Sequence, residues 1–390
     1  MVNKPDDIRI QRINLKNTSV YTKEIISYID VLERKIISYK DLVFHDIIYE
    51  KEVIQSLYEN RFHTKPIFER LKMISDYIAD RYETDFNVSV SKKNRQQIYD
   101  SLLEMLNFTD VVALYQNFVD YLSNKYDILK GDKIDTCEIL YEDIYPIVLI
   151  KILLFGTHGF QNIKHVIIDE MQDYNATQYE ILNRIFDCNM TILGDIQQVI
   201  YKTNDDVIEK LKDMFQDRVK LIKMMKSYRS TLEISEFCKN ICNATEMEPF
   251  DRHGKEPLIV KCNGYNNMVL GIEKTINKVD PKSYSTVAVI CKSKKSAQKF
   301  YNSIRNKDDY YLMNDENTEF REGKIITNAF LAKGLEFDMV IIPEVTITNY
   351  KTDIDRQILY VACTRALHEL YLYYYDEVSE FIQKYPVKIP

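Results

Sequence analysis

The sequence predicts an α/β protein in which parallel β-sheets are flanked by helices, with a helical region before them. Apolar residues repeat at helical spacing up to about residue 150, and short β-branched runs alternate with helical patterns from about residue 163 onward. Strands and helices that alternate in this way form buried parallel sheets. We expect a helical accessory subdomain over residues 1–140, a first α/β lobe over 141–254 and a second over 255–390.

The bulk composition suits such an organisation. The chain has 390 residues, 45% of them hydrophobic, which is enough for two or three domains with their own cores. No apolar run approaches the roughly 20 residues of a membrane span, and the start lacks a signal-peptide pattern, so we expect a cytoplasmic protein with no membrane partner. Seven scattered cysteines without a C-x-x-C pair favour reduced thiols. A net charge of −7 argues against a histone-like binder but not against a local groove for nucleic acid.

The N-terminal region shows amphipathic helices. Ile67, Leu71, Ile74 and Ile78 fall on one helix face, and Thr109-Asp110 offers an N-cap for a helix over 111–122. We interpret these stripes as core and find no chemistry in residues 1–140.

Two short β-branched runs, 163–168 and 190–193, enclose a helical pattern over 178–186, which predicts a βαβ unit. In open parallel sheets, ligands bind beyond the carboxyl ends of the strands. The first run is followed by Asp169-Glu170-Met-Gln172-Asp173, and adjacent carboxylates there can hold Mg²⁺ and orient water that attacks a phosphate. The second run is followed by the polar turn 194–201.

The second lobe shows five further strand-like runs with helical patterns between them, for example over 297–304. We expect the residue Phe330, at the end of one run, to be core. The five runs are 257–262, 286–291, 324–330, 337–343 and 369–375.

Five short blocks follow one another along the chain: DEMQD (169–173), GDIQQVIY (194–201), KSYRS (226–230), KGLEF (333–337) and YVACTRA (360–366). In this order they resemble motifs II to VI of the UvrD/Rep-type superfamily 1 helicases. The resemblance covers residues 140–375 well and residues 1–140 only loosely. It implies RecA-like lobes of the P-loop NTPase kind, the first of them incomplete.

The surroundings of these blocks resemble the HelD-like branch of those helicases. Tyr141-Glu-Asp143 precedes the first strand, and the KGLEF block lies within FLAKGLEFD. Only some 30 residues separate Cys291 from Lys324, where UvrD and Rep carry a large inserted subdomain.

The resemblance implies a role for each matching residue in the first lobe. Asp169 would ligate Mg²⁺, and Glu170 would activate the hydrolytic water. Gln198 would couple the γ-phosphate of ATP to the nucleic-acid site, and Tyr201 could stack on a base or could be ordinary packing.

The second group of motifs would complete the nucleotide site. Tyr228 would stack on adenine, and Arg229 would reach the γ-phosphate. Gly334 and Glu336 would line the nucleotide cleft, and Arg365 would act as an arginine finger. ATP with Mg²⁺ would close the cleft and hydrolysis would reopen it, which is the general basis for stepping along a DNA strand.

One expected motif is missing. A P-loop needs G-x-x-x-x-G-K-[ST], and none of the nine glycines begins this pattern. Three explanations stay open: a fragment of a longer protein, a split gene whose separate chain or upstream segment carries the Walker A loop, or a degenerate relative that binds without hydrolysing. We expect this chain alone to hydrolyse little or no ATP.

The favoured function is therefore the core of an ATP-dependent DNA helicase or translocase. One alternative is a HelD-like factor that binds RNA polymerase and releases it from nucleic acid. Another is a non-catalytic nucleic-acid binder, whose affinity for single strands would fall steeply with salt and would not respond to nucleotide.

Overall fold

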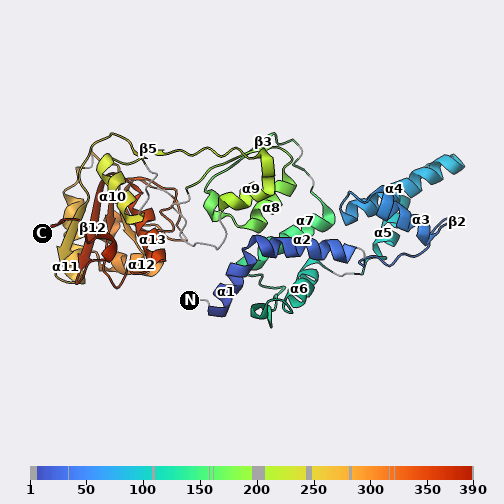
Figure 1. The fold of residues 1–390 in the computed structure, drawn as a ribbon, viewed down its shortest axis with the longest axis horizontal. Helices are drawn as coiled ribbons and strands as arrows, with labels where there is room; N and C mark the ends of the chain where they lie inside the picture. Colours follow the sequence, from blue (N-terminus) through green and yellow to red (C-terminus); the bar gives the residue numbers. More distant parts are fainter. Residues whose placement is uncertain are drawn as a thin grey trace. The chain divides into compact units, whose positions relative to one another are not determined.

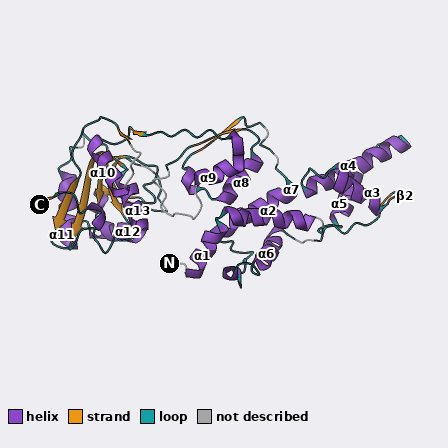
Figure 2. Ribbon diagram, in the orientation of Figure 1, coloured by secondary structure: helices purple, strands orange, loops and turns teal. Residues whose placement is uncertain are grey.

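A computed structural model describes residues 7–388, apart from residues 34, 108–109, 158, 161, 196–206, 243–247, 281–282, 316 and 320. The contacts divide the chain into two compact units. The first unit takes the described residues up to Gly194 and those from Val207 to Val219, and the second takes Asp195 and the described residues from Lys220 onward. Helices dominate the first unit, and the large sheet belongs to the second (Figures 1 and 2).

The centre of the first unit is a helical bundle around α7. This helix contacts α1, α2 and α6, which precede it in the sequence, and α8, which follows it. The side chain of Asp110 accepts a hydrogen bond from the Ala113 amide at 2.8 Å, so the predicted cap of the helix over 111–122 is confirmed at Asp110; Thr109 lies outside the described residues. The elements of the bundle are α1 (Asp7–Lys16), α2 (Ser19–Glu33), α6 (Val111–Leu122), η2 (Asp127–Leu129), α7 (Tyr141–Phe155) and α8 (Ala176–Ile185).

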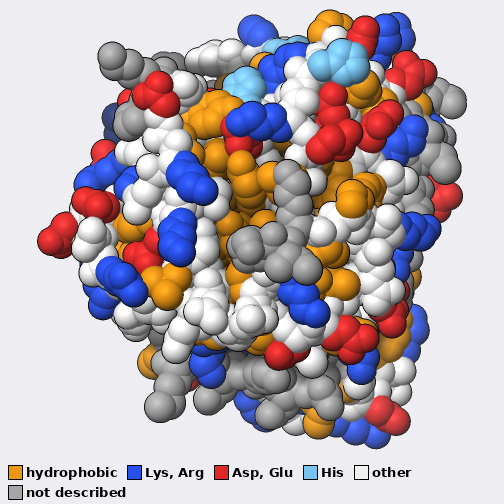
Figure 3. Space-filling view, turned by 90° about the vertical axis from the view of Figure 1, so that its left-hand side faces the viewer, with side chains coloured by type: hydrophobic (Ala, Val, Ile, Leu, Met, Phe, Trp, Pro, Cys, Tyr) orange, Lys and Arg blue, Asp and Glu red, His pale blue; other side chains and the backbone are white. Residues whose placement is uncertain are grey.

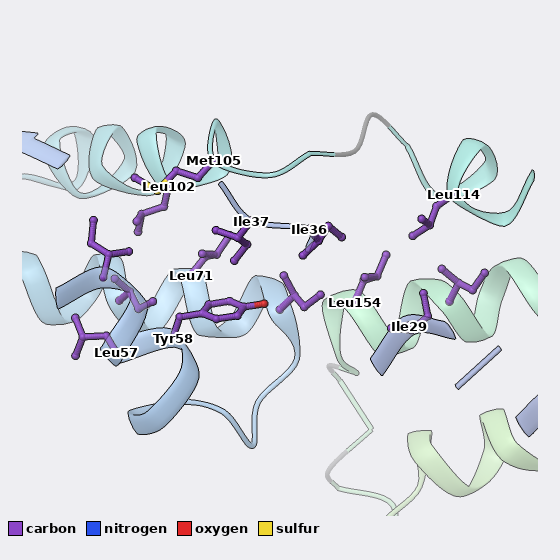
Figure 4. Packing of buried hydrophobic residues seen from close by; sticks show 14 of the residues in the cluster. Ile29, Ile36, Ile37, Leu57, Tyr58, Leu71, Leu102, Met105, Leu114 and Leu154 are labelled. Atoms are coloured by element: carbon purple, nitrogen blue, oxygen red, sulfur yellow. The ribbon is translucent and has the colours of Figure 1, made fainter. Parts of the chain in front are cut away.

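A second group of elements, which we call the distal block (residues 35–107), is inserted between α2 and α6. Its core contains the predicted stripe of α4, whose four isoleucine and leucine side chains are buried. Figure 4 shows one of them, Leu71, among its buried neighbours. The chain enters and leaves the block side by side, because Ile37 and Leu106 form an antiparallel bridge. The block consists of β1 (Leu42–Phe44), β2 (Ile47–Tyr49), α3 (Lys51–Ser56), the π-helix η1 (Leu57–Arg61), α4 (Ile67–Phe86) and α5 (Lys92–Leu103).

The remaining part of the first unit is the predicted βαβ unit. Strands β3 (His165–Ile168) and β4 (Asn189–Ile192) are parallel, with α8 between them in the sequence. Two short helices, η3 (Met171–Asp173) and α9 (Val207–Phe215), lie before and after β4 in the sequence, and η5 (Gln216–Arg218) follows. The expected burial of this sheet is wrong for the described residues, because the sheet has two strands and the side chain of Ile167 is 69% exposed.

The second unit is built on a seven-stranded sheet in the order β13-β7-β12-β11-β8-β10-β9, in which every neighbouring pair is parallel. The five predicted strands are confirmed, and the two edge strands β9 and β13 were not predicted. The strands are β7 (Leu258–Cys262), β8 (Thr286–Cys291), β9 (Tyr310–Leu312), β10 (Gly323–Asn328), β11 (Phe337–Ile342), β12 (Ala366–Tyr375) and β13 (Val387–Lys388).

Helices cover both faces of this sheet, so the predicted α/β fold class is confirmed. Leu370 and Leu372 belong to the core shared with α10 and α13, while Tyr371 and Tyr373 pack with α11 and α12, as the alternation of side chains along β12 requires. The helices are α10 (Leu232–Cys242), α11 (Tyr265–Asn277), α12 (Lys294–Ser303), η6 (Lys307–Asp309), α13 (Asp353–Cys363) and η7 (Glu380–Ile382).

Two further observations complete the second unit. A separate parallel pair, β5 (Lys226–Ser227) and β6 (Glu248–Pro249), precedes the large sheet. The prediction that Phe330 is core is wrong: β10 ends at Asn328, and Phe330 lies in the following turn with 40% of its surface exposed.

The contacts give two units where the sequence predicts three parts. Helices α1 and α2, from the predicted accessory subdomain, pack on α7 and α8 of the predicted first lobe. The assignment of residues 1–140 as an accessory subdomain stays a prediction. In the described part of the chain no helix combines the length and the apolar character that crossing a membrane requires.

Candidate nucleotide site

The acidic loop after β3 is a tight turn held by its own hydrogen bonds. Glu170 adopts a left-handed backbone conformation with φ 54°, which residues other than glycine, asparagine and aspartate rarely adopt. The Oδ1 atom of Asp169 accepts from the Glu170 amide at 2.8 Å, and the Gln172 side-chain amide donates to a carboxylate oxygen of Glu170. Strained backbone persists only where surrounding contacts fix it. The hydrogen bonds of this loop therefore hold the turn in place after β3.

The turn after β4 packs directly on this loop. The Leu193 amide donates to the Ile168 carbonyl at 2.7 Å, and the Met171 amide donates to the Leu193 carbonyl at 2.8 Å. Gly194 makes this approach possible, because a Cβ atom there would lie 2.5 Å from Gln172 Oε1 and 2.7 Å from the Met171 nitrogen. The DEMQD block and the start of GDIQQVIY are therefore neighbours, whereas Gln198 and Tyr201 lie outside the described residues.

Helix α8 carries the acidic loop at its N-terminus, and its first turn is anchored to the α1–α2 corner. Asn175 and Gln178 form a capping box, in which each side chain bonds the other's backbone. The Asn175 side-chain amide also donates to Asn17 Oδ1 at 2.8 Å, and the hydroxyls of Thr22 and Thr177 lie 2.9 Å apart. Sequence reasoning missed this anchor, although the Asn-x-x-Gln spacing of the capping box was readable.

In the second unit, two motif residues form an ion pair. The Nε atom of Arg229 lies 2.5 Å from Oε1 of Glu336, and the two side chains are 39% and 43% exposed. Arg229 lies between β5 and α10, and Glu336 immediately precedes β11. The pair thus joins the KSYRS and KGLEF blocks at a surface that solvent reaches.

Arg365 differs from what an arginine finger would need, because only 1% of the residue is exposed. Its Nε atom donates to the Val361 carbonyl at 3.1 Å, and Nη1 and Nη2 donate to the Leu335 carbonyl at 3.4 Å and to Thr364 Oγ1 at 3.1 Å. A buried guanidinium is stable only when such partners replace its hydration. In this state Arg365 is directed into its own lobe, and contact with a phosphate requires it to move.

The structure describes the surroundings of Tyr228 and Gly334, whose roles in the site stay predictions. The Tyr228 ring is 58% exposed and lies 5.0 Å from the Phe250 ring between centroids, which leaves aromatic surface for stacking. Gly334 has φ +80°, and a Cβ atom there would meet no atom within 4 Å. The positive φ explains why glycine occupies this position, because an added Cβ atom would not clash with its neighbours.

Four hydrogen bonds to backbone carbonyls link the KSYRS, KGLEF and YVACTRA blocks and their neighbours. Ser230 Oγ donates to the Ala366 carbonyl at 2.6 Å, and the Phe337 amide donates to the Arg365 carbonyl at 2.9 Å. Arg252, which belongs to none of the blocks, donates through Nη2 to the carbonyls of Arg229 at 2.6 Å and Leu367 at 2.8 Å. No spacing in the sequence pointed to Arg252.

Motif residues lie at the carboxyl end of a strand in the first unit and at the amino ends of strands in the second unit. Asp169 and Glu170 follow the carboxyl end of β3, as expected. Glu336 and Arg365 instead precede β11 and β12, at the amino ends of these parallel strands. If the predicted roles of Glu336 and Arg365 hold, the site of the second unit lies at the amino ends of strands and not at their carboxyl ends.

The fit to Mg²⁺ can be judged from the donor set alone. Within residues 7–388, as far as they are described, no group of three or more His, Cys, Asp or Glu side chains could hold a metal ion. Mg²⁺ in phosphoryl-transfer sites usually has one or two carboxylates, with phosphate oxygens and waters as its other ligands. Asp169 offers one such carboxylate, and its role as a Mg²⁺ ligand stays a prediction.

Comparison with known families decides the family of the chain. Residues 9–218 match the UvrD/REP helicase N-terminal domain, and residues 325–373 match the UvrD-like helicase C-terminal domain. The chain belongs to the UvrD/REP helicase family. The RecA-like character of its α/β lobes follows from this membership and from the helix-flanked parallel sheet.

Relatives in this family include proteins named as helicases. The chain is 31% identical to ATP-dependent DNA helicase srs2 of Schizosaccharomyces pombe over 200 residues, which are 50% of this chain and 19% of srs2. It is 23% identical to the putative ATP-dependent DNA helicase R568 of Acanthamoeba polyphaga mimivirus over 351 residues, 79% of this chain and 49% of R568. The matches thus span less than half the length of these curated relatives.

Among solved structures, the chain is similar to the C-terminal domain of a possible DNA helicase from Lactobacillus plantarum WCFS1. The two are 31% identical, and the match covers 40% of this chain and 93% of that domain with a TM-score of 0.35.

Proposed function

We propose that this UvrD/REP family chain is the core portion of an ATP-dependent DNA helicase or translocase, which couples ATP hydrolysis to movement on nucleic acid. The family match over residues 9–218 carries this proposal, because that segment contains the acidic loop after β3. The residue types at the motif positions support it: a carboxylate pair in the first unit, and two arginines in the second.

Each side chain has a defined task in this function. Asp169 would hold the Mg²⁺ of bound ATP, and Glu170 would accept the proton of the attacking water. Arg229 and Arg365 would balance charge that develops on the transferred phosphate, and Tyr228 would stack on the base. Bound Mg²⁺ and ATP would supply the Lewis acid and the phosphoryl group.

The assignments of Gly334, Gln198 and Tyr201 follow the same family pattern. Gly334 lies two residues before Glu336 and would line the nucleotide cleft with it. Gln198 would transmit the state of the γ-phosphate, and Tyr201 would contact a base of single-stranded DNA.

The missing Walker A loop limits what this chain does by itself. We propose that the loop comes from a separate chain or from an upstream segment, and that without it turnover is very low. In the described residues this sheet has the two strands β3 and β4, and Ile167 of β3 is exposed. These observations support a missing neighbour, since parallel sheets are rarely stable as isolated pairs of strands.

A HelD-like role is the second candidate. In the described residues between β8 and β10 the elements are α12, η6 and β9, and a connection of this length has no space for a large inserted subdomain. A HelD-like factor would bind RNA polymerase and would use ATP-linked motion to release it from nucleic acid. Co-sedimentation with RNA polymerase, set beside strand displacement on a tailed DNA duplex, distinguishes this role from a DNA helicase.

The first experiment is ATP turnover by the purified chain with and without single-stranded DNA. Addition of a polypeptide that carries G-x-x-x-x-G-K-[ST] should raise turnover, and Glu170→Gln should abolish the gain. Turnover at ordinary helicase rates by the chain alone would contradict the requirement for an added loop. Salt-sensitive binding of single strands, with no turnover under any condition and no effect of nucleotide, would indicate a non-catalytic binder.

A further inference from the structure

The Arg229–Glu336 pair has a feature that the nucleotide site does not require. Glu336 is an anion, and its carboxylate pairs with the guanidinium of Arg229. The same guanidinium is assigned to bind the γ-phosphate of ATP. A guanidinium presents donors in a planar fork that suits carboxylate and phosphate alike. The Glu336 carboxylate and a phosphate would therefore use the same Arg229 donors.

We propose that Glu336 is an internal competitor for the phosphate-binding arginine: its carboxylate holds Arg229 when nucleotide is absent, and the terminal phosphate of a bound triphosphate displaces it. This inference rests on the proposed nucleotide function and adds a regulatory property to it. Glu336 is then a positioning residue for Arg229, distinct from a residue that only contacts the nucleotide.

The backbone of Arg229 is fixed independently of this pair. Arg252 Nη2 donates to the Arg229 carbonyl, and Ser230 Oγ donates to the Ala366 carbonyl. The guanidinium can therefore exchange its partner without moving the main chain. Glu336 is anchored in the same way, because the next residue, Phe337, is bound through its amide to Arg365.

The strength of the pair suits an exchange. Both side chains are more than a third exposed, and ion pairs of this kind are weak because water and salt screen them. A fully buried pair would resist an incoming phosphate. This partly exposed pair should lower the affinity of the chain for phosphate only several-fold. The same screening predicts that the competition fades at high ionic strength.

The test uses tripolyphosphate, which has no base or ribose, as the probe for the full chain at low ionic strength. Isothermal titration calorimetry would compare the natural chain with Glu336→Gln. We expect the glutamine variant to bind tripolyphosphate about threefold more tightly, because the competing charge is lost while the side-chain size is kept. Glu319→Gln is the matched control, since Glu319 also pairs with an arginine, Arg321, outside the five blocks.

Four outcomes would decide against the proposal. An equal gain in Glu319→Gln would make the effect one of net charge alone. Binding that needs Arg229 but is unchanged in Glu336→Gln would overturn the competition and leave the proposed function intact. Binding that Arg229→Ala leaves unchanged would remove Arg229 from the site and would count against the proposed function as well. No binding by any variant would overturn the competition, and the turnover experiment would then judge the proposed function separately.

Discussion

The Nζ atom of Lys16 lies 2.6 Å from Oδ1 of Asp143, and both side chains are almost wholly buried. The same ammonium lies 2.7 Å from Oδ2 of Asp132, and the Tyr115 hydroxyl donates to Asp143 at 2.7 Å. A charged cluster therefore fixes the end of α1 against α7, next to Asn17. Through Asn17 and Asn175 this end of α1 contacts the helix that follows the acidic loop.

Replacing Lys16 should destabilise the first unit strongly. Lys16→Met keeps the length of the side chain but leaves two carboxylates buried beside each other, and breaking a buried pair in this way costs about 3–5 kcal/mol. The loss in free energy of unfolding is measured by urea denaturation, with circular dichroism as the signal. Lys125→Met, which removes an exposed lysine paired with Glu24, should leave the free energy of unfolding nearly unchanged. Equal stability of both variants would contradict the structural role of the cluster.

Glu170→Gly should make the protein more stable while it removes the proposed catalytic base. Glycine adopts the left-handed conformation of residue 170 without strain, and the gain should be about 1 kcal/mol. Glu170→Ala is the matched comparison, since it removes the same carboxylate but keeps a Cβ atom. Thermal unfolding of the two variants measures the difference. If alanine is as stable as glycine, the backbone at this position carries no strain.

Asn175 should contribute to stability in two separable ways. Asn175→Ala removes the N-cap of α8 together with the bond to Asn17, and loss of a cap alone costs about 1 kcal/mol. Asn175→Ser keeps a capping oxygen but is too short to reach Asn17. The free energy of unfolding should therefore fall less for serine than for alanine. Equal losses would show that the bond to Asn17, and not the cap, is what matters.

The stability of the second unit should depend on Glu369 in acid. Burial raises the pKa of Glu369, but hydrogen bonds from Lys255, Tyr284 and Tyr371 together outweigh it, so the net pKa lies below the ordinary 4.5. A pKa that is lower in the folded state means that the ionised form stabilises the fold at neutral pH. This stabilisation is lost as the pH falls through 4.5 towards the folded-state pKa.

Glu369→Gln tests this dependence. The difference in free energy of unfolding between the natural chain and the variant should be largest near neutral pH and should shrink as the pH falls to about 3. Glu380→Gln, at an exposed glutamate, provides the control. A difference that does not change with pH would show that Glu369 acts through packing alone.

The large sheet of the second unit could be predicted because its central strands are buried on both faces and therefore read as short runs of mainly apolar residues. Strands β9 and β13 were missed because three and two residues are too few to show a pattern. The partial exposure of Phe330 could not be read from its run, since the strand ends two residues earlier.

The candidate site could be predicted as a set of residues but not as a geometry. The resemblance of the blocks to helicase motifs pointed to Arg229, Glu336 and Arg365, and both their place in the site and their chemical roles stay predictions. The burial of Arg365 depends on carbonyls of Val361 and Leu335, and such tertiary contacts leave no periodic signal. Arg252 was invisible for the same reason, because its partners lie 23 and 115 residues away in sequence.

The distal block has its two ends at one place. The Ser38 amide donates to the Met105 carbonyl and the Asn107 amide donates to the Ile36 carbonyl, at 2.8 and 2.7 Å. An insertion whose ends meet imposes no spacing on α2 and α6, and closing a longer or shorter loop at that point changes the free energy only slightly. The length of the block can therefore change away from its contact with α7 while the helices that support the acidic loop keep their register, but removal of the whole block would expose the core that α4 shares with α7.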